Sequence, residues 1–210
     1  GVSRSENISK RQIEMWVHQH RAILIKQDID KGKIPNPDYI QSIPSLQLEV
    51  VDESDGGDIE SDSYILRTQL EIPKTLDLNF KSGFTYIGTI DGNEIQFIPE
   101  GRRKWQQYKK YTKNDNLAFL RDNKLYLIYP KPIQQITVKG IFEVPTEVMN
   151  IVNSHYTPTE GGWSDPYPIP INMLPTLKEM ILKKELGIGV SALSDNKNDS
   201  SNFVSKDITS

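Results

Sequence analysis

The sequence has no cysteine and only three histidines, His18, His20 and His155. The absence of cysteine excludes disulfide bridges, thiolate zinc sites and a cysteine nucleophile. His18 and His20 are expected to lie on one helix about 200° apart, which is a poor arrangement for sharing a metal ion. We therefore expect no cofactor, no metal site and no catalytic residue.

Long apolar runs and an excess of basic residues are also missing. No stretch of 18 apolar residues occurs, so we expect no membrane span, and the first five residues lack the apolar segment of a signal peptide. Lys and Arg number 25 against 28 Asp and Glu, for a formal net charge of −3. A general nucleic-acid binder would carry a basic excess, so the charge balance argues against one.

What remains is a chain of 210 residues with 36% hydrophobic residues, the size of one domain or of one domain with arms. The pattern predicts an α+β fold: a long N-terminal helix, a mostly antiparallel β body, a C-terminal helix and an extended arm. The β body is expected to be a small sandwich or an open barrel. The expected divisions are residues 1–34, 45–150, 151–170, 171–187 and 188–210.

The first of these segments contains a helix over about residues 9–31. Ser9 and Gln12 form a capping box, and apolar residues recur at spacings of three and four. Gly32 and Pro35 stop the helix. His20 is expected to face the core, and His18 to face solvent or a partner. The helical face consists of Ile13, Trp16, Val17, His20 and Leu24.

The middle of the chain reads as about seven strands. Leu46, Leu48 and Val50 alternate with polar residues, as in a half-buried strand. An Asp91-Gly92 turn predicts a hairpin over 83–98 with a type I′ turn. A second hairpin is expected over 117–129, turning at 122–123, and a last strand over 133–144. Six acidic residues between 52 and 62 predict a solvated loop rather than a calcium site, since the spacing does not match the calcium-binding loop.

The C-terminal part combines a loop, a helix and a polar tail. Residues 151–170 are rich in proline and glycine and read as an ordered loop or arm. A helix is expected over about 172–186, capped by Asn172 and ended by Gly187. The tail 188–210 has few apolar residues and cannot offset its own ordering entropy alone. We therefore expect another molecule to hold it in place.

A local basic segment interrupts this acidic chain at residues 101–113, where three aromatic residues are interleaved with the basic ones. It reads either as a contact for phosphates or an acidic partner, or as a charged rim around aromatic residues that pack inward. If it binds DNA or a partner, the contacts are expected from Arg102, Arg103, Lys104, Lys109, Lys110 and Lys113.

Four short stretches resemble virion structural proteins of crAss-like and related Bacteroidetes phages. They are residues 8–16 (ISKRQIEMW), 21–28 (RAILIKQD), 36–41 (NPDYIQ) and 169–174 (IPINML), the last followed by the Asp- and Asn-rich tail. The resemblance covers the two ends, about a third of the chain, and does not extend to the sheet region.

This resemblance implies a neck component: a connector ring between the portal and the tail of a short-tailed phage. Such rings are usually twelvefold, DNA passes through their channel, and they carry no catalytic residues. The expected partners are other copies of the chain, the portal, other neck or tail ring proteins and packaged DNA, all within the virion and none in a membrane. Subunit contacts are expected from Trp16, Arg21, Leu193, Phe203, Val204 and Ile208.

Two other functions stay open at this level. The aromatic residues Trp105, Tyr108, Tyr111 and Trp163 would suit a β-sandwich module that recognises a host glycan or receptor. An enzyme acting through carboxylates has less support, because no recognisable catalytic or nucleotide-binding motif occurs in the sequence.

Overall fold

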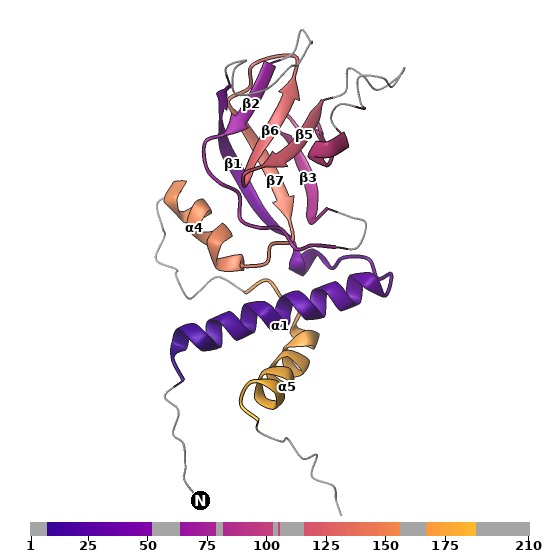
Figure 1. Cartoon of the computed structure of the whole chain (residues 1–210), viewed down its shortest axis with the longest axis vertical. Coiled ribbons are helices and arrows are strands. Elements are labelled where there is room, and N and C mark those ends of the chain that lie inside the picture. Colours follow the sequence, from indigo (N-terminus) through magenta and orange to yellow (C-terminus); the bar gives the residue numbers. More distant parts are fainter. Residues whose placement is uncertain are drawn as a thin grey trace, which may run out of the picture.

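The structure, a computed structural model, describes residues 8–51, 64–78, 82–102, 105, 116–155 and 167–187. The fold is α+β, as predicted. A seven-stranded sheet that curls into a nearly closed barrel occupies one end of an elongated molecule, and two helices occupy the other (Figure 1). The barrel form decides between the two expected β architectures, a sandwich and an open barrel.

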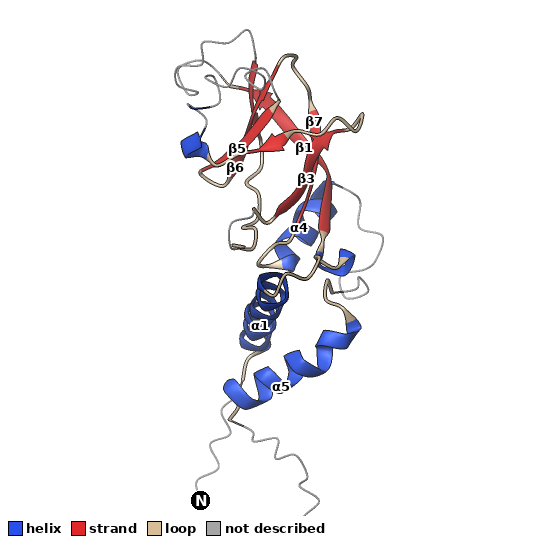
Figure 2. Cartoon of the chain, turned by 90° about the vertical axis from the view of Figure 1, so that its right-hand side faces the viewer, coloured by secondary structure: helices blue, strands red, loops and turns tan. Residues whose placement is uncertain are grey.

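Helix α1 (Lys10–Asp30) matches the predicted N-terminal helix closely. The Ser9 side chain accepts a hydrogen bond from the Gln12 amide, and the Gln12 side chain bonds back to Ser9, so the capping box is confirmed. Gly32, at φ +79°, follows the last turn, a conformation that glycine adopts without strain. At about 1.5 Å per residue the helix is ~32 Å long, and it is covered on two sides (Figure 2).

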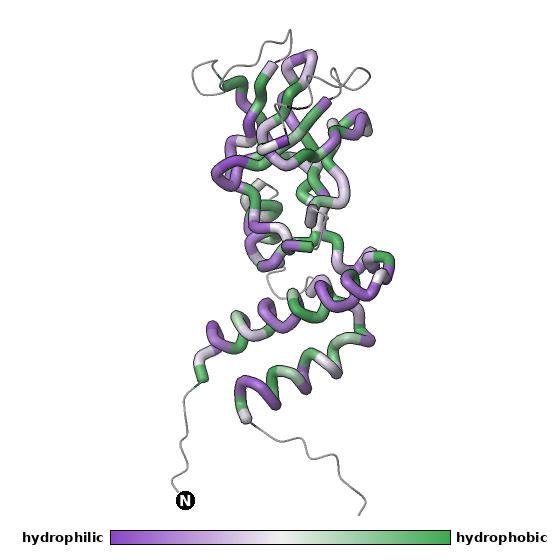
Figure 3. The backbone as a smooth tube through the Cα atoms, turned by 45° about the vertical axis from the view of Figure 1, so that its right-hand side comes forward, coloured by the Kyte–Doolittle hydropathy of each residue, from purple (hydrophilic) through white to green (hydrophobic). Residues whose placement is uncertain are grey.

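The sheet has the order β3-β7-β1-β2-β6-β5-β4. All neighbours pair antiparallel except β4 and β5, which pair parallel. Hydrophobic and hydrophilic residues alternate along the strands (Figure 3). The main core lies inside the barrel, with Leu66, Leu127 and Ile136 fully buried. The strands are β1 (Gln41–Val50), β2 (Tyr64–Thr68), β3 (Phe84–Thr89), β4 (Gln96–Phe97), β5 (Leu117–Arg121), β6 (Lys124–Tyr129) and β7 (Gln135–Gly140).

The two predicted hairpins have different outcomes. Between β5 and β6, Asp122 and Asn123 both have positive φ, at 49° and 58°, so the turn at 122–123 is confirmed. The type I′ turn at 91–92 is wrong, because only Gly92 has a positive φ. The Gly92 amide instead donates to the Thr89 carbonyl, as in a type I turn followed by a left-handed residue.

Strand edges depart from the predicted alternation at two places. Val50 was expected to share the buried face of Leu46 and Leu48 but is 58% exposed. The β1–β7 register shifts between Ile43 and Leu46, and the strand reaches its last paired position with β2 at Val50. The last strand, expected over 133–144, is confined to β7.

Helix α4 (Pro145–His155) was not predicted. It occupies the end of the expected β body and the first part of the segment that was read as a loop or arm, so that interpretation is wrong for residues 151–155. Val148 anchors it against the barrel core with 2% exposure, and Ile151 and Val152 pack beside it. The i, i+3, i+4 spacing of these three residues is helical, but the proline- and glycine-rich sequence that follows obscured it. The rest of that loop, 156–166, lies outside the described residues.

Helix α5 (Leu174–Lys184) is close to the predicted C-terminal helix. The predicted Asn172 cap is wrong: Asn172 lies in the short 3-10 helix η3 (Ile171–Met173), and Met173 precedes α5 without a side-chain cap. A proline in the first turn needs no amide partner, and Gly187, at φ +60°, follows the helix as expected. Two further 3-10 helices are η1 (Pro37–Tyr39) and η2 (Glu100–Arg102).

Candidate functional site

A buried cation, Arg21, links the helical layer to the barrel. Its side chain is 0% exposed. Nε donates to the Pro168 carbonyl at 2.7 Å, Nη1 to the Phe142 carbonyl at 2.9 Å and Nη2 to the Tyr39 carbonyl at 3.4 Å. These acceptors come from three segments far apart in sequence, so one guanidinium joins α1 to η1, to the end of the barrel and to the residues that lead to α5.

This placement corrects the expectation that Arg21 contacts a neighbouring subunit. The side chain is fully enclosed within its own chain, and the charge is satisfied there by three carbonyl dipoles. Burial lowers the pKa of Arg21 to about 10, so the guanidinium stays charged at neutral pH. The Tyr167 ring also lies near it, with the guanidinium carbon 5.8 Å from the ring centroid.

His18 forms a second buried contact on the same side of α1. Its Nδ1 lies 2.7 Å from the Tyr167 hydroxyl, and the two rings are stacked with centroids 5.7 Å apart. Its Nε2 faces the Thr146 hydroxyl at 3.5 Å and a Glu14 carboxylate oxygen at 3.7 Å. The expectation that His18 faces solvent or a partner is therefore wrong.

Burial lowers the pKa of His18, against the opposing attraction of Glu14. Burial also raises the pKa of Tyr167 to about 12, so its hydroxyl keeps its proton. The neutral imidazole then accepts a hydrogen bond from that hydroxyl at Nδ1 and carries its own proton on Nε2, toward Glu14 and Thr146. The arrangement suits the neutral form of His18.

His20 points to the other side of α1, as predicted, and is 3% exposed. Its Nε2 lies 2.8 Å from a Glu185 carboxylate oxygen just beyond α5. Both histidines are buried because α1 is enclosed between two layers, with the barrel and α4 on one side and α5 on the other (Figure 2). The predicted ~200° separation of the two histidines is confirmed. The sequence did not predict that α5 would cover the second side of α1.

Helix α5 packs on α1 through a small apolar cluster of its own. Leu24, Ile169 and Leu177 are each less than 9% exposed, and Met180 and Ile181 pack beside them. This cluster is separate from the barrel core. A third cluster, of Ile25, Tyr39, Leu76, Leu78 and Ile141, packs α1 against the end of the barrel beside the Arg21 contacts.

The N-terminal half of α1 carries exposed apolar side chains. Ile13 is 46% exposed and Met15 is 55% exposed, while Trp16 is half-buried. The expected interface role of Trp16 is compatible with this position. The remaining predicted contacts, Leu193, Phe203, Val204 and Ile208, lie outside the described residues.

Little of the basic segment is described. Arg102 ends η2 and is exposed, and Trp105 is 71% exposed. At Trp105, therefore, the aromatic side chain does not pack inward. Arg103, Lys104, Lys109, Lys110 and Lys113 lie outside the described residues, as do the acidic residues 52–62 and the aromatic residues Tyr108, Tyr111 and Trp163.

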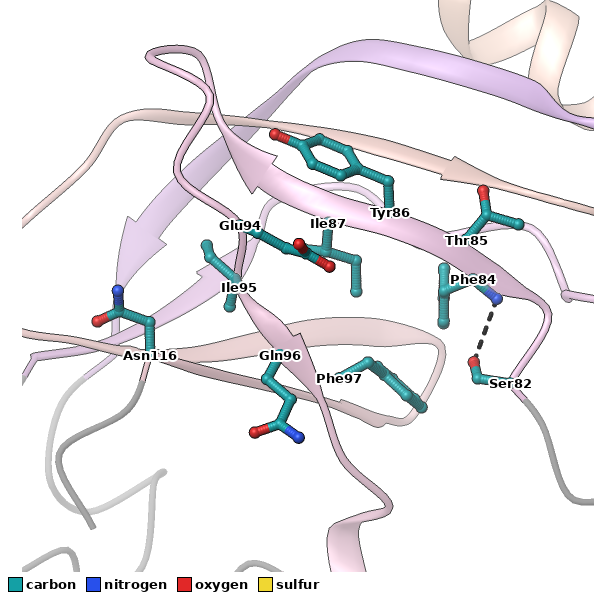
Figure 4. A pocket seen from close by; sticks show the side chains of 10 residues that line it. All are labelled: Ser82, Phe84, Thr85, Tyr86, Ile87, Glu94, Ile95, Gln96, Phe97 and Asn116. Atoms are coloured by element: carbon teal, nitrogen blue, oxygen red, sulfur yellow. Dashed lines mark hydrogen bonds between the residues drawn. The ribbon is translucent and has the colours of Figure 1, made fainter. Parts of the chain in front are cut away.

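The barrel is incompletely closed between β3 and β4, and we call this gap the barrel seam. A cavity of about 650 Å³ opens there. Figure 4 shows Phe84, Ile87, Ile95 and Phe97 around it, with Glu94 at its rim. A second cleft, of about 530 Å³, lies between α4, the start of β1 and residues 167–171. No pattern in the sequence predicted either cavity.

The described part of the chain shows neither a metal-binding cluster nor a membrane-spanning helix. No cluster of three or more His, Asp or Glu side chains is arranged to hold a metal ion there. Within the same ranges, no helix is long and apolar enough to cross a membrane.

Comparison with known families decides what kind of protein this is. The family of phage tail ring protein 2, from crAss-like phages, matches residues 1–208. The chain belongs to this family. The predicted resemblance is confirmed and extends over the sheet region, which the short stretches did not reach. Membership in a phage tail ring family makes the chain a structural protein of the virion tail and favours a non-enzymatic role. No curated protein matches the chain.

Proposed function

We propose that the chain forms a connector ring between the portal and the tail of a short-tailed phage, with DNA passing through its central channel. The family match over residues 1–208 carries this proposal. Twelve copies per ring is the number implied by the resemblance of the chain ends. Other neck or tail ring proteins would lie above and below.

The shape of the molecule supports a ring subunit. A cyclic ring needs two different surfaces on each copy, so that one copy's first surface meets the next copy's second. The barrel and the α1–α5 layer lie at opposite ends of the elongated molecule (Figure 1), and Arg21 and His18 hold them in one arrangement. The subunit therefore presents separated surfaces with a fixed relative orientation.

The set of residues proposed to contact neighbouring subunits no longer includes Arg21. Trp16, with the exposed Ile13 about one turn before it on the same face of α1, is proposed as one contact surface. The tail residues Leu193, Phe203, Val204 and Ile208 are proposed as anchors on a neighbouring subunit. The basic residues between 102 and 113 are proposed to contact DNA or another ring protein. Arg102 is exposed, as such a contact requires.

A reconstitution experiment tests the connector role. The purified protein is mixed with the purified portal of the same phage, and complexes are separated by size and imaged by electron microscopy. A connector should form a stacked, coaxial complex with the portal. If the protein assembles into rings that never bind the portal or another neck ring, the position between portal and tail is wrong.

A second candidate is a binding module for a host glycan or receptor. The 71% exposure of Trp105 favours it, because sugar-binding surfaces commonly use exposed aromatic rings. A glycan array screened with the assembled protein separates the two functions. Binding that is lost in Trp105→Ala would support the receptor role, and an array without binding would remove it.

A further inference from the structure

Within the described residues, the barrel seam leaves part of one strand edge without a ladder partner. β3 pairs with β7, with a shift of register between Phe84 and Tyr86. Its other edge meets β4 and the residues before β4 at the Gly88–Glu94 bridge, at the hydrogen bond from the Thr89 amide to the Asn93 carbonyl, 2.9 Å, and at the hydrogen bond from the Ile95 amide to the Ile87 carbonyl, 2.8 Å. From there β4 turns away and pairs with β5. No described strand pairs with this edge of β3 at residues 84–86.

Side chains close the seam where the backbone does not. The Phe84 and Phe97 rings lie 4.9 Å apart, one from each strand, and both pack half-buried against the barrel core. The cavity of about 650 Å³ above them is within the ~300–1,000 Å³ range of sites that bind small ligands or side chains. An open edge beside an apolar floor is the arrangement used when an extended segment adds a strand to a sheet.

We propose that residues 201–210 of a neighbouring copy pair with the open edge of β3 and place Phe203 in the cavity against Phe84 and Phe97. This inference rests on the proposed function, because it needs adjacent copies in a ring. In an extended segment Phe203 and Val204 face opposite sides. Phe203 would therefore face the cavity, while Val204 and Ile208 cover the outside of the seam.

The length and position of the tail select this occupant. The described chain ends at Gly187, beyond α5, at the end of the molecule opposite the barrel (Figure 2). Residues 188–210 follow, and 23 extended residues span up to ~75 Å. A segment of this length reaches a barrel on the next copy. Tail and seam then form the pair of unlike surfaces that a closed ring requires.

Two other segments outside the described structure fit the seam less well. Residues 1–7 span at most ~25 Å and contain one large apolar residue, Val2. Residues 52–62 carry six acidic side chains and would meet the exposed Glu94 at the cavity rim. In residues 201–210 the charges of Lys206 and Asp207 offset each other, so no such repulsion arises.

Engineered disulfides test the proposal, because the natural chain has no cysteine and every disulfide formed must be the designed one. Thr85 is exposed on the outer face of the β3 edge, and Lys206 faces the same side as Val204, opposite to Phe203. Paired strand positions have Cα atoms about 4.5–5.5 Å apart, within the ~4.4–6.8 Å that a disulfide allows. The double variants are Thr85→Cys with Lys206→Cys, and Thr85→Cys with Val204→Cys for the neighbouring register.

Rings of each full-length variant are treated with a mild oxidant and run on a non-reducing gel. At least one double variant should give a ladder of covalent oligomers that collapses to monomer on reduction. The matched control is Lys131→Cys with Lys206→Cys, since Lys131 is exposed on the β6–β7 connection away from the seam. The control and the single variants should give no ladder.

The outcomes separate this inference from the proposed function. If the untreated full-length protein is a monomer by mass, the ring itself fails. If rings form but both double variants give no more ladder than the control, the seam is not the docking site. A fast-migrating monomer with an internal disulfide would show that each tail occupies its own barrel, which also overturns the proposal.

Discussion

At the residue scale, Arg21 is the largest fully buried side chain of the described chain. A buried charge is stable only when hydrogen bonds replace the water it loses. Here the Pro168, Phe142 and Tyr39 carbonyls provide them. Because each acceptor also loses its partner if the guanidinium is removed, Arg21 is expected to matter for folding of the subunit rather than for contact with another one.

Arg21→Met should lower the free energy of unfolding by about 3 kcal/mol or more, because unsatisfied buried polar groups cost roughly 1–3 kcal/mol each. Urea denaturation of the protein measures the change. The matched control is Arg11→Met, an exposed arginine on the same helix, which should be nearly neutral. If Arg21→Met is fully stable but no longer assembles, Arg21 acts in a contact between subunits and this account of it is wrong.

The buried His18 should make the free energy of unfolding depend on pH. Its folded-state pKa is lowered by burial, so the folded chain binds fewer protons at this site than the unfolded chain. The contribution of His18 is therefore fully present above the unfolded pKa of about 6.5 and is lost as pH falls through the lower folded pKa. Glu14 opposes the effect, and Arg21 reinforces it.

The measurement is urea denaturation of wild type and His18→Gln between pH 7.5 and 5.5. The wild type should lose more stability on acidification than His18→Gln, which has no imidazole to protonate at this position. Parallel curves for the two proteins would show that the contacts with Tyr167 and Thr146 do not favour the neutral imidazole.

At the scale of elements, α5 depends on one small apolar contact with α1. Leu177 is 4% exposed. Leu177→Ala should therefore weaken the packing of α5 on α1 by about 2–4 kcal/mol, as expected for truncation of a buried leucine. Because its cluster is separate from the barrel core, α5 should become sensitive to protease while the barrel stays intact. Limited proteolysis followed by mass spectrometry measures whether α5 or the barrel is cleaved.

Lys178→Ala, one residue away and exposed, is the control for that experiment. It should leave both stability and protease resistance unchanged. Simultaneous digestion of barrel and helices in Leu177→Ala would contradict the separation of the α1–α5 cluster from the barrel core.

The elements also show which parts of the fold could be predicted from the sequence and which could not. α1 was predicted nearly to its ends because its signals are local: the Ser9–Gln12 capping box and Gly32. The 122–123 turn was likewise encoded by adjacent residues. β3 and β4 were predicted as a regular hairpin, but β4 takes β5 as its main partner, a choice made by residues more than 20 positions away.

The candidate site was predictable only in part for the same reason. The spacing of His18 and His20 placed them on opposite faces of α1, but only the structure shows that Tyr167 and Glu185, some 150 residues later, cover both. Arg21 carried no sequence signal for burial. The phage ring resemblance came from local stretches and is confirmed by the family match.

At the scale of the whole molecule, the tail 188–210 is expected to serve assembly rather than folding. Its deletion should leave the melting temperature of the monomer nearly unchanged and weaken ring formation, because the apolar residues in it are too sparse to build a core. Thermal denaturation and size measurement of the truncated chain check the two effects. A large loss of monomer stability would show that the tail belongs to the subunit's own core.

The central claim is that this chain closes into a ring through unlike surfaces on successive copies. The most direct measurement is electron microscopy of the purified full-length protein, with the rotational symmetry determined from end-on views. The account predicts closed rings of a single symmetry, twelvefold, with barrels and helical layers at different heights. A monomer, or a dimer in which identical surfaces face each other, would contradict it.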